Sequence, residues 1–183
     1  GIIAILATVV ILTLNPAELL RQARDSTRTS DFSTLKSAIS LFGADVATSS
    51  GAYGIAITGA TPTCYASIST GGVVPAWGLN CGGRFVPRAS MTVVLSSEVN
   101  KRLVNGSGWI PVNMNAISSG APISALPIDP ISPNSSSSYY AYATDGSGGF
   151  EVNGVLESTK FASSSYNDGG NNNFLYEAGT QPG

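Results

Sequence analysis

The first part of the chain changes from a wholly apolar pattern to an amphipathic one. Residues 1–17 carry no charged side chain, and residues 2–14 are almost entirely aliphatic. From residue 18 onward, apolar side chains recur at spacings of three and four among polar ones, which predicts a helix with one core-facing stripe. The stripe consists of Phe32, Leu35, Ala38, Ile39 and Phe42. We therefore predict one long helix from about residue 2 to residue 42, ended by Gly43 and locally disturbed at Pro16, whose ring removes a backbone hydrogen bond.

The aliphatic stretch is too apolar for an ordinary surface helix. As a helix it would span about 25 Å, which is marginal for a single membrane crossing. A helix that is apolar on every face needs cover on every face, so we interpret the stretch as a segment for lipid and for partner helices. A signal peptide and a buried core helix are the alternatives. The residues assigned to this assembly segment are Ile2, Ile3, Ile5, Leu6, Val9, Val10, Ile11, Leu12, Leu14 and Pro16.

Charged residues are concentrated immediately after the aliphatic stretch. Seven of the twenty charged side chains lie between residues 18 and 36. Their spacing predicts surface ion pairs Glu18–Arg21, Arg21–Asp25 and Arg28–Asp31, each contributing about 0.2–0.5 kcal/mol. The sequence thus predicts a charged collar between an apolar rod and the rest of the chain.

Residues 44–183 have the composition of a β-rich head with long loops. The clearest signal is a hairpin, with strands at 139–144 and 149–156 on either side of Asp145-Gly146. We predict further strands at 174–178 and 91–95, with a helical turn as the alternative just after the latter, at 96–103. The segments 51–59, 67–83 and 117–133 are predicted to be irregular. The fold class is therefore α+β: a helical domain at 1–43 packs on a small antiparallel sheet in a head domain at 44–183.

Composition excludes several classes of function. The chain of 183 residues contains no histidine, which excludes a Ser/His/Asp triad and a histidine metal site. A net charge of −2, with only 11% charged residues, argues against a nucleic-acid surface, and no specific nucleic-acid site is evident. Paired carboxylates at Glu151 and Glu157 would suit glycoside hydrolysis if they approached each other. Nothing else indicates catalysis, so we expect no enzyme.

The two cysteines and one acidic loop are the remaining candidate features. Cys64 and Cys81 are predicted to form a structural disulfide in an exported protein, which stabilises by about 3 kcal/mol in the chain-entropy model. Asp168 lies in an Asn/Gly-rich loop whose oxygens are the ligand type that Ca²⁺ prefers. A single carboxylate is a poor calcium site unless Asp129, Asp145 or Glu177 folds close to it, and an Asx turn is the alternative. We therefore expect no cofactor, with calcium as the one weak candidate.

Several short motifs resemble one known family. They are Leu-Asn-Pro-Ala at 14–17, Arg-Gln-Ala-Arg-Asp at 21–25, Ser-Asp-Phe-Ser-Thr-Leu-Lys-Ser-Ala at 30–38, Leu-Pro-Ile-Asp-Pro at 126–130, Ser-Tyr-Tyr-Ala-Tyr at 138–142, Glu-Ser-Thr-Lys at 157–160 and Tyr-Glu-Ala-Gly-Thr at 176–180. Together they resemble the helix and the later part of the head of type IV pilins and secretion pseudopilins, especially the major-pseudopilin type. The middle of the chain, about 45–125, resembles nothing that we can name. The family's Phe-Thr-Leu-Ile-Glu type of start is missing, so we expect that further residues precede Gly1.

The resemblance implies both a fold and a function. It implies the type IV pilin fold and a major pilin that polymerises with copies of itself into an extracellular, pilus-like filament. The subunit would be anchored in the inner membrane before assembly and would serve adhesion, motility or DNA uptake. A pseudopilin of a type II secretion system and a membrane-anchored extracellular binding domain are the alternatives. Major pseudopilins bind calcium in a C-terminal loop, so the resemblance adds support to Asp168 as a candidate calcium ligand.

Overall fold

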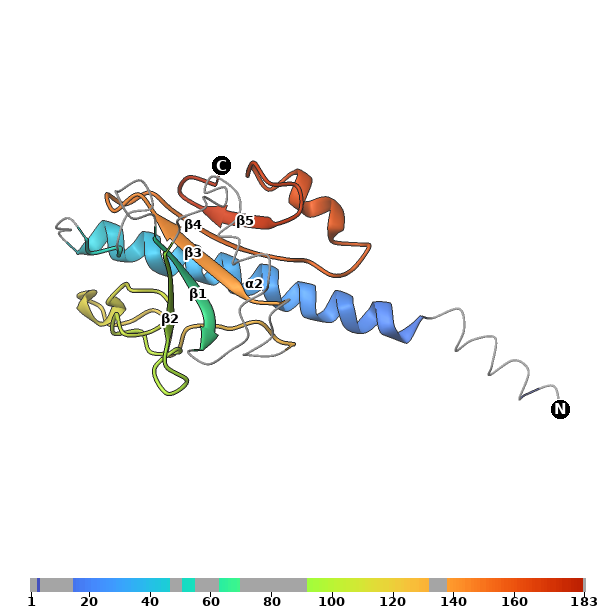
Figure 1. The fold of residues 1–183 in the computed structure, drawn as a ribbon, viewed down its shortest axis with the longest axis horizontal. Helices are drawn as coiled ribbons and strands as arrows, with labels where there is room; N and C mark the ends of the chain where they lie inside the picture. The colour runs from blue at the N-terminus through green and yellow to red at the C-terminus, as the bar shows by residue number, and fades with distance from the viewer. Residues whose placement is uncertain are drawn as a thin grey trace.

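The long helix α2 lies across one face of a five-stranded sheet (Figure 1). The computed structural model describes residue 3 and residues 15–46, 51–54, 63–69, 92–131 and 138–182. Helix α2 spans Pro16–Asp45, and it packs on strands β4 and β5 and on the side chain of Tyr140 in β3. The architecture is therefore α+β, as predicted.

Helix α2 begins at Pro16, so the prediction of a helix running through this position from residue 2 is wrong. Asn15 has φ 39° and ψ 72°, a left-handed conformation outside the helix, and its side chain accepts a hydrogen bond from the Glu18 N–H at 3.4 Å. Proline is well suited to the first helical position because its missing N–H would have no partner there. The Asn-Pro pair therefore starts a helix and does not kink a continuous one.

The other end of α2 lies two residues beyond the predicted stop. Gly43 is still helical, and the helix ends at Asp45, where the Val46 N–H donates to the Phe42 carbonyl at 2.9 Å. A Cβ built on Gly43 would lie 2.2 Å from the hydroxyl of Tyr53. The glycine leaves room for the Tyr53 side chain to pack closely against this part of the helix.

The sheet has the strand order β2-β1-β3-β4-β5. The strands are β1 Thr63–Ser69, β2 Thr92–Ser96, β3 Tyr140–Thr144, β4 Phe150–Gly154 and β5 Tyr176–Gly179, and two short 3₁₀ helices are η1 Met114–Ala116 and η2 Ala162–Tyr166. Strands β1 and β2 are parallel, whereas β1–β3, β3–β4 and β4–β5 are antiparallel. The predicted antiparallel sheet is thus corrected to a mixed one.

All four predicted strands are present, but a fifth strand, β1, was not predicted. The predicted hairpin forms as β3 and β4, and its loop is closed by Asp145, whose carboxylate accepts the N–H groups of Ser147 and Gly149. Strands β2 and β5 match the predictions at 91–95 and 174–178 within one or two residues. The start of the segment predicted as irregular, 67–69, belongs to β1. Between β2 and β3, the described residues form hydrogen-bonded turns, an isolated antiparallel bridge between Asn105 and Asn113, and η1; the described residues 117–131 are irregular, as predicted.

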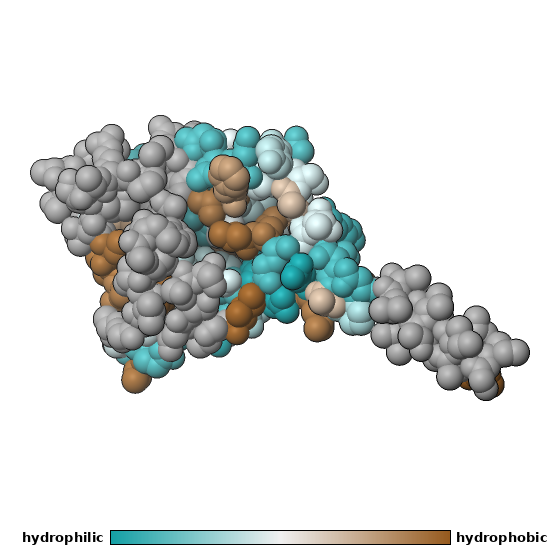
Figure 2. All heavy atoms as spheres, turned by 45° about the vertical axis from the view of Figure 1, so that its right-hand side comes forward, coloured by the Kyte–Doolittle hydropathy of each residue, from teal (hydrophilic) through white to brown (hydrophobic). Residues whose placement is uncertain are grey.

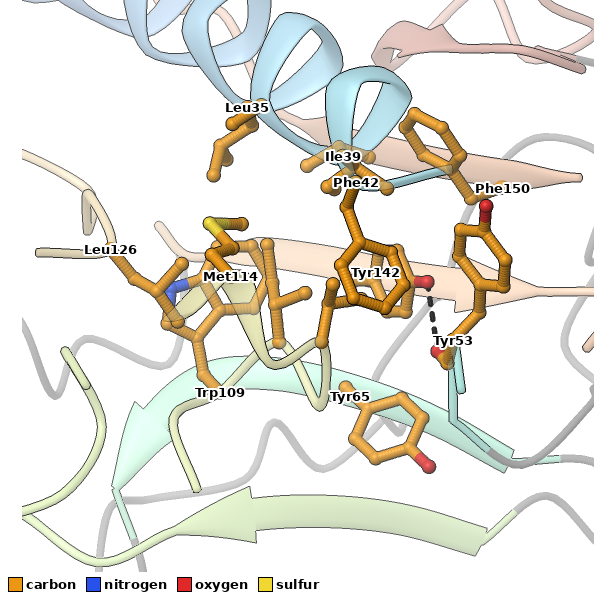
Figure 3. Packing of buried hydrophobic residues seen from close by; sticks show 14 of the residues in the cluster. Leu35, Ile39, Phe42, Tyr53, Tyr65, Trp109, Met114, Leu126, Tyr142 and Phe150 are labelled. Carbon is orange, nitrogen blue, oxygen red and sulfur yellow. Dashed lines mark hydrogen bonds between the residues drawn. The ribbon is translucent and has the colours of Figure 1, made fainter. Parts of the chain in front are cut away.

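The core lies between α2 and the sheet, and Figure 3 shows its aromatic side chains converging below the helix. All five residues of the predicted apolar stripe are buried, with exposed fractions of 0–2%. They pack against side chains from η1, the preceding loop and the central strands, including Trp109, Met114, Tyr142 and Phe150. The Tyr142 hydroxyl donates to the Tyr53 carbonyl at 2.9 Å, so this buried phenol has a partner.

Candidate functional site

The predicted assembly segment falls largely outside the described residues. Of its members, the structure describes Ile3, which is helical and 83% exposed, and Pro16, the first residue of α2. The positions of the other members (Ile2, Ile5, Leu6, Val9, Val10, Ile11, Leu12 and Leu14) therefore stay a prediction. In the part of the chain that is described, no helix is both long enough and apolar enough to cross a membrane.

The charged part of α2 is attached to the head through one buried arginine. The side chain of Arg28 is 0% exposed. Its Nε and Nη2 donate to the two oxygens of Asp129 at 2.8 and 3.0 Å, which is a bidentate pair. Its Nη1 donates to Asp25 Oδ1 at 2.8 Å and also contacts Glu157 Oε1. One guanidinium thus joins the helix to two segments that lie 101 and 129 residues further along the chain.

The carboxylate of Asp25 joins the helix to the segment after β4. Asp25 is 0% exposed and accepts the N–H groups of Glu157 and Ser158, together with the Ser158 hydroxyl, at 2.6–3.0 Å. Two turns before it, Glu18 accepts the N–H and the hydroxyl of Thr159, both at 2.8 Å. The residues 157–159 therefore run alongside the helix, fixed by its acidic side chains. We call Asp25, Arg28, Asp129 and Glu157, with the hydroxyl of Ser158, the anchor cluster.

The anchor cluster corrects two of the three predicted surface ion pairs. The Glu18–Arg21 pair forms at 3.7 Å. Arg28, however, is bonded to Asp25 and not to Asp31, which instead accepts the Tyr140 hydroxyl at 2.8 Å. The predicted Arg21–Asp25 pair is replaced because Asp25 is buried against the head. The helix charges therefore face the head as well as the solvent.

The electrostatics of the cluster favour its ionised form. Burial disfavours the charged Arg28 guanidinium, but the hydrogen bonds and charges of its carboxylate partners, Asp129 first, raise its pKa above the ordinary value. Burial likewise opposes ionisation of Asp25, but the bonds from Ser158, Glu157 and Arg28 lower its pKa. The pKa of Glu157 is lowered against burial by Arg24 and Arg28. Each buried charge thus has the partners that burial requires.

The sequence contained a signal for this cluster that periodicity did not capture. Asp129 is a single acidic residue between prolines in an otherwise apolar segment, and burial is costly for such a residue unless it is paired. Arg28 falls on the helix face of the apolar stripe, four residues before Phe32. Each of the two residues is charged in apolar surroundings, so the sequence could have suggested that Arg28 pairs with Asp129.

The calcium candidate, Asp168, lies next to one of its three possible partners. The backbone N–H of Glu177 donates to Asp168 Oδ2 at 2.7 Å, while Asp129 is bonded to Arg28 and Asp145 closes its own turn. Asp168 Oδ1 accepts the Gly170 N–H at 2.8 Å, which is the Asx turn weighed as the alternative. Within residues 15–46, 51–54, 63–69, 92–131 and 138–182, no group of three or more acidic or cysteine side chains could hold a metal ion. Calcium binding stays a prediction.

Glu177 is a buried acidic residue near this loop whose carboxyl oxygens do not both have a hydrogen-bond partner within the described part of the chain. It is 1% exposed, and its Oε2 accepts the Asn172 N–H at 2.8 Å. Its Oε1 has no hydrogen-bond partner among the residues that the structure describes. Burial is the main reason that the pKa of Glu177 is raised, and the charge of Asp168 raises it further, whereas hydrogen bonds from Asn172 and Glu151 partly oppose this.

The remaining predicted residues lie elsewhere. Cys64, on β1, is buried and disulfide-bonded, and Cys81, its predicted partner, lies outside the described residues. The carboxylates considered for glycoside hydrolysis have other partners: Glu157 is bonded to Arg24 and Arg28, and Glu151 accepts the Asn153 amide at 2.7 Å.

Comparison with known proteins does not identify a relative. No family model, no curated protein and no solved structure matches this chain.

Proposed function

We propose that this chain is the structural subunit of a type IV pilus-like extracellular filament. Its apolar N-terminal segment would pack against the same segment of neighbouring copies in the filament core, and its head would face outward. The subunit would be held in the inner membrane before assembly. Adhesion, motility and DNA uptake are the roles that the pilin resemblance implies for such a filament.

The observation that carries the proposal is a helix that is bonded to the head from Glu18 onward while apolar side chains of its first turns stay exposed. The N-terminal turns of α2 extend beyond the sheet (Figure 1). Here Leu19 and Leu20 are 51% and 61% exposed. Figure 2 shows mostly hydrophilic residues around the described helix where it leaves the head, with a few separate hydrophobic side chains among them. An exposed helix end of this kind suits contact with other copies.

The physical chemistry of the predicted segment favours assembly. Burial of each Val, Leu or Ile side chain contributes about 1.5–3 kcal/mol relative to exposure to water. The apolar segment of one copy would contact a different face of the next copy, which is a head-to-tail contact. When such contacts repeat without closing into a ring, they produce a helical fibre. The anchor cluster would keep the head in one orientation on α2 in every copy.

The proposal is tested by electron microscopy of material sheared from cells that express the chain, with an antibody to the head as the label. We expect long labelled fibres. A chain found only in membrane fractions, without fibres, would overturn the proposal.

A surface variant tests the projecting end of α2 directly. We expect Leu19→Ser with Leu20→Ser to reduce the yield of sheared fibres severalfold and to leave the thermal unfolding of the head unchanged, because both side chains are already exposed. Val99→Ser, which alters an 88% exposed side chain in the turn after β2, is the matched control and should leave the yield unchanged. Equal yields for the double variant and the control would exclude this end of α2 from the contact.

A further inference from the structure

A hollow of about 410 Å³ lies beside the C-terminal loop of the head, where α2, η2 and β5 meet. Its walls come from Thr29 on α2, Phe161, Ser163 and Ser164 at η2, Asn167 and Asp168 in the loop, and Tyr176 on β5. Its size falls within the range of small-molecule sites in proteins, about 300–1,000 Å³. Its lining residues are distinct from those of the anchor cluster and from Leu19 and Leu20, although Phe161 and Thr29 each donate a hydrogen bond to a residue of that cluster.

The walls of this hollow are held in place by the fold. The ring of Tyr176 stacks on the buried ring of Phe32, with centroids 5.7 Å apart and planes 24° apart. The Ser165 hydroxyl is within hydrogen-bond distance of the Ala162 and Asn173 carbonyls, at 2.9 and 2.8 Å, so it links η2 to the loop. The Asn167 amide donates to the Ser163 carbonyl at 3.2 Å. An aromatic ring and an amide are thus oriented before any ligand arrives.

The polar groups in the hollow retain hydrogen-bonding capacity. Among the described residues, the hydroxyls of Ser163, Ser164 and Tyr176 have no protein partner. Asn167 uses one amide hydrogen, which leaves its second hydrogen and its carbonyl oxygen. Each oxygen of Asp168 accepts one backbone N–H and can accept a second donor. Donors and acceptors are therefore both present, next to two aromatic rings.

The lining decides the chemical class of ligand. Among the described lining residues Asp168 is the charged one, and its carboxylate disfavours phosphate and other anions, although the Lys160 ammonium lies 5.3 Å from the centroid of the Phe161 ring. The many hydroxyl and amide groups would lose hydrogen bonds to a purely apolar ligand. We propose that the hollow binds a neutral hexopyranose ring, either as a free sugar or as the terminal residue of a glycan. The C–H face of the pyranose would lie on an aromatic ring, and its hydroxyls would bond to Asn167, the serines and Asp168.

The test is saturation-transfer NMR on the full chain, in a zwitterionic detergent that carries no sugar head group. The probes are a panel of methyl hexopyranosides at millimolar concentration, with sorbitol as an acyclic polyol and inorganic phosphate as comparisons. We expect transfer to the ring protons of at least one hexopyranoside and none to sorbitol. No transfer to any hexopyranoside, or equal transfer to sorbitol, would overturn the proposal.

Two conservative variants locate the binding. We expect Asn167→Ala and Tyr176→Phe each to weaken the Kd at least about fivefold, since each removes hydrogen-bonding groups and Tyr176→Phe keeps the stacked ring. Asn100→Ala, an exposed asparagine in the turn after β2, is the matched control and should leave the Kd unchanged. Wild-type affinity in both hollow variants would contradict the assignment. Binding to an immobilised oligosaccharide that ends in the same ring would indicate a glycan as the source, and binding of the free sugar alone would indicate a metabolite.

Discussion

The two halves of α2 are attached to the head by different forces. From Phe32 to Phe42 the helix is held by buried apolar side chains, whereas from Glu18 to Arg28 it is held by ion pairs and hydrogen bonds. Apolar contact is strong but tolerates sliding, because it has no direction. Bidentate ion pairs have a fixed geometry. The first half therefore sets the register of the helix against the head, and the second half supplies most of the burial.

The largest expected effect comes from removing the guanidinium of the anchor cluster, which tests whether ion pairs hold the first half of α2. We expect Arg28→Met to lower the free energy of unfolding by about 4 kcal/mol, because it leaves buried carboxylates without their counter-charge. The measurement is urea unfolding of the full chain followed by tryptophan fluorescence. Arg24→Met is the control: its ion pair with Glu157 is partly exposed, and we expect a loss below about 1 kcal/mol. Equal losses for the two variants would show that the burial of Arg28 has no special energetic weight.

The apolar half should respond next most strongly. We expect Leu35→Ala to lower the free energy of unfolding by about 3 kcal/mol, because Leu35 is 0% exposed and its truncation leaves a cavity in the core. The same urea experiment measures it. Leu41→Ala changes a 41% exposed side chain on the same helix and should cost much less. If Leu35→Ala lowered the free energy of unfolding no more than Leu41→Ala does, apolar burial would not be what holds the second half of α2 to the head.

The smallest expected change in stability comes from Glu177, a buried carboxyl group that, unlike Asp25 and Glu157, is not paired with an arginine among the residues that the structure describes. We expect Glu177→Gln to raise the free energy of unfolding by about 1 kcal/mol at pH 7, because Gln keeps an acceptor for the Asn172 N–H and removes a buried charge. The measurement is thermal unfolding as a function of pH. A loss of stability at pH 7 would contradict the assignment.

The pH dependence of the two groups has opposite sign. The pKa of Glu177 is raised in the folded state, so its ionisation costs stability as pH rises from the unfolded value of about 4.3 through the folded value. The pKa values of Asp25 and Glu157 are lowered in the folded state, so their contribution is complete above about 4.3 and is lost as pH falls through the folded values. Glu177→Gln should therefore flatten only the part of the profile above pH about 4.3.

The sequence was sufficient to predict the parts of the fold that depend on local pattern. The buried stripe of α2 follows from spacings of three and four, and the β3–β4 hairpin follows from two strand-like runs around Asp145-Gly146. The parallel pairing of β1 with β2 could not be predicted, because it joins segments about thirty residues apart whose order in the sheet leaves no local signal.

The same limit applies to the candidate sites. Neighbouring charges on a helix predicted the Glu18–Arg21 pair, but Arg28 and Asp129 are 101 residues apart and meet only when the core is complete. The sugar-binding hollow likewise depends on α2, η2 and β5 coming together. Asp168 stood out in the sequence, whereas Asn167 and Tyr176 did not, because only the fold places them on the same hollow.

The strand order also has a consequence for how the chain folds. The partners of α2 in β4 and β5 are synthesised more than one hundred residues after it, and β1 must wait for β3, as the pair Tyr65–Tyr142 shows. Contacts between such distant segments form slowly, and exposed apolar surface promotes aggregation in the meantime. The stripe from Phe32 to Phe42 therefore emerges early and is covered late, so we expect a newly made chain to be prone to aggregation until the last strand is in place.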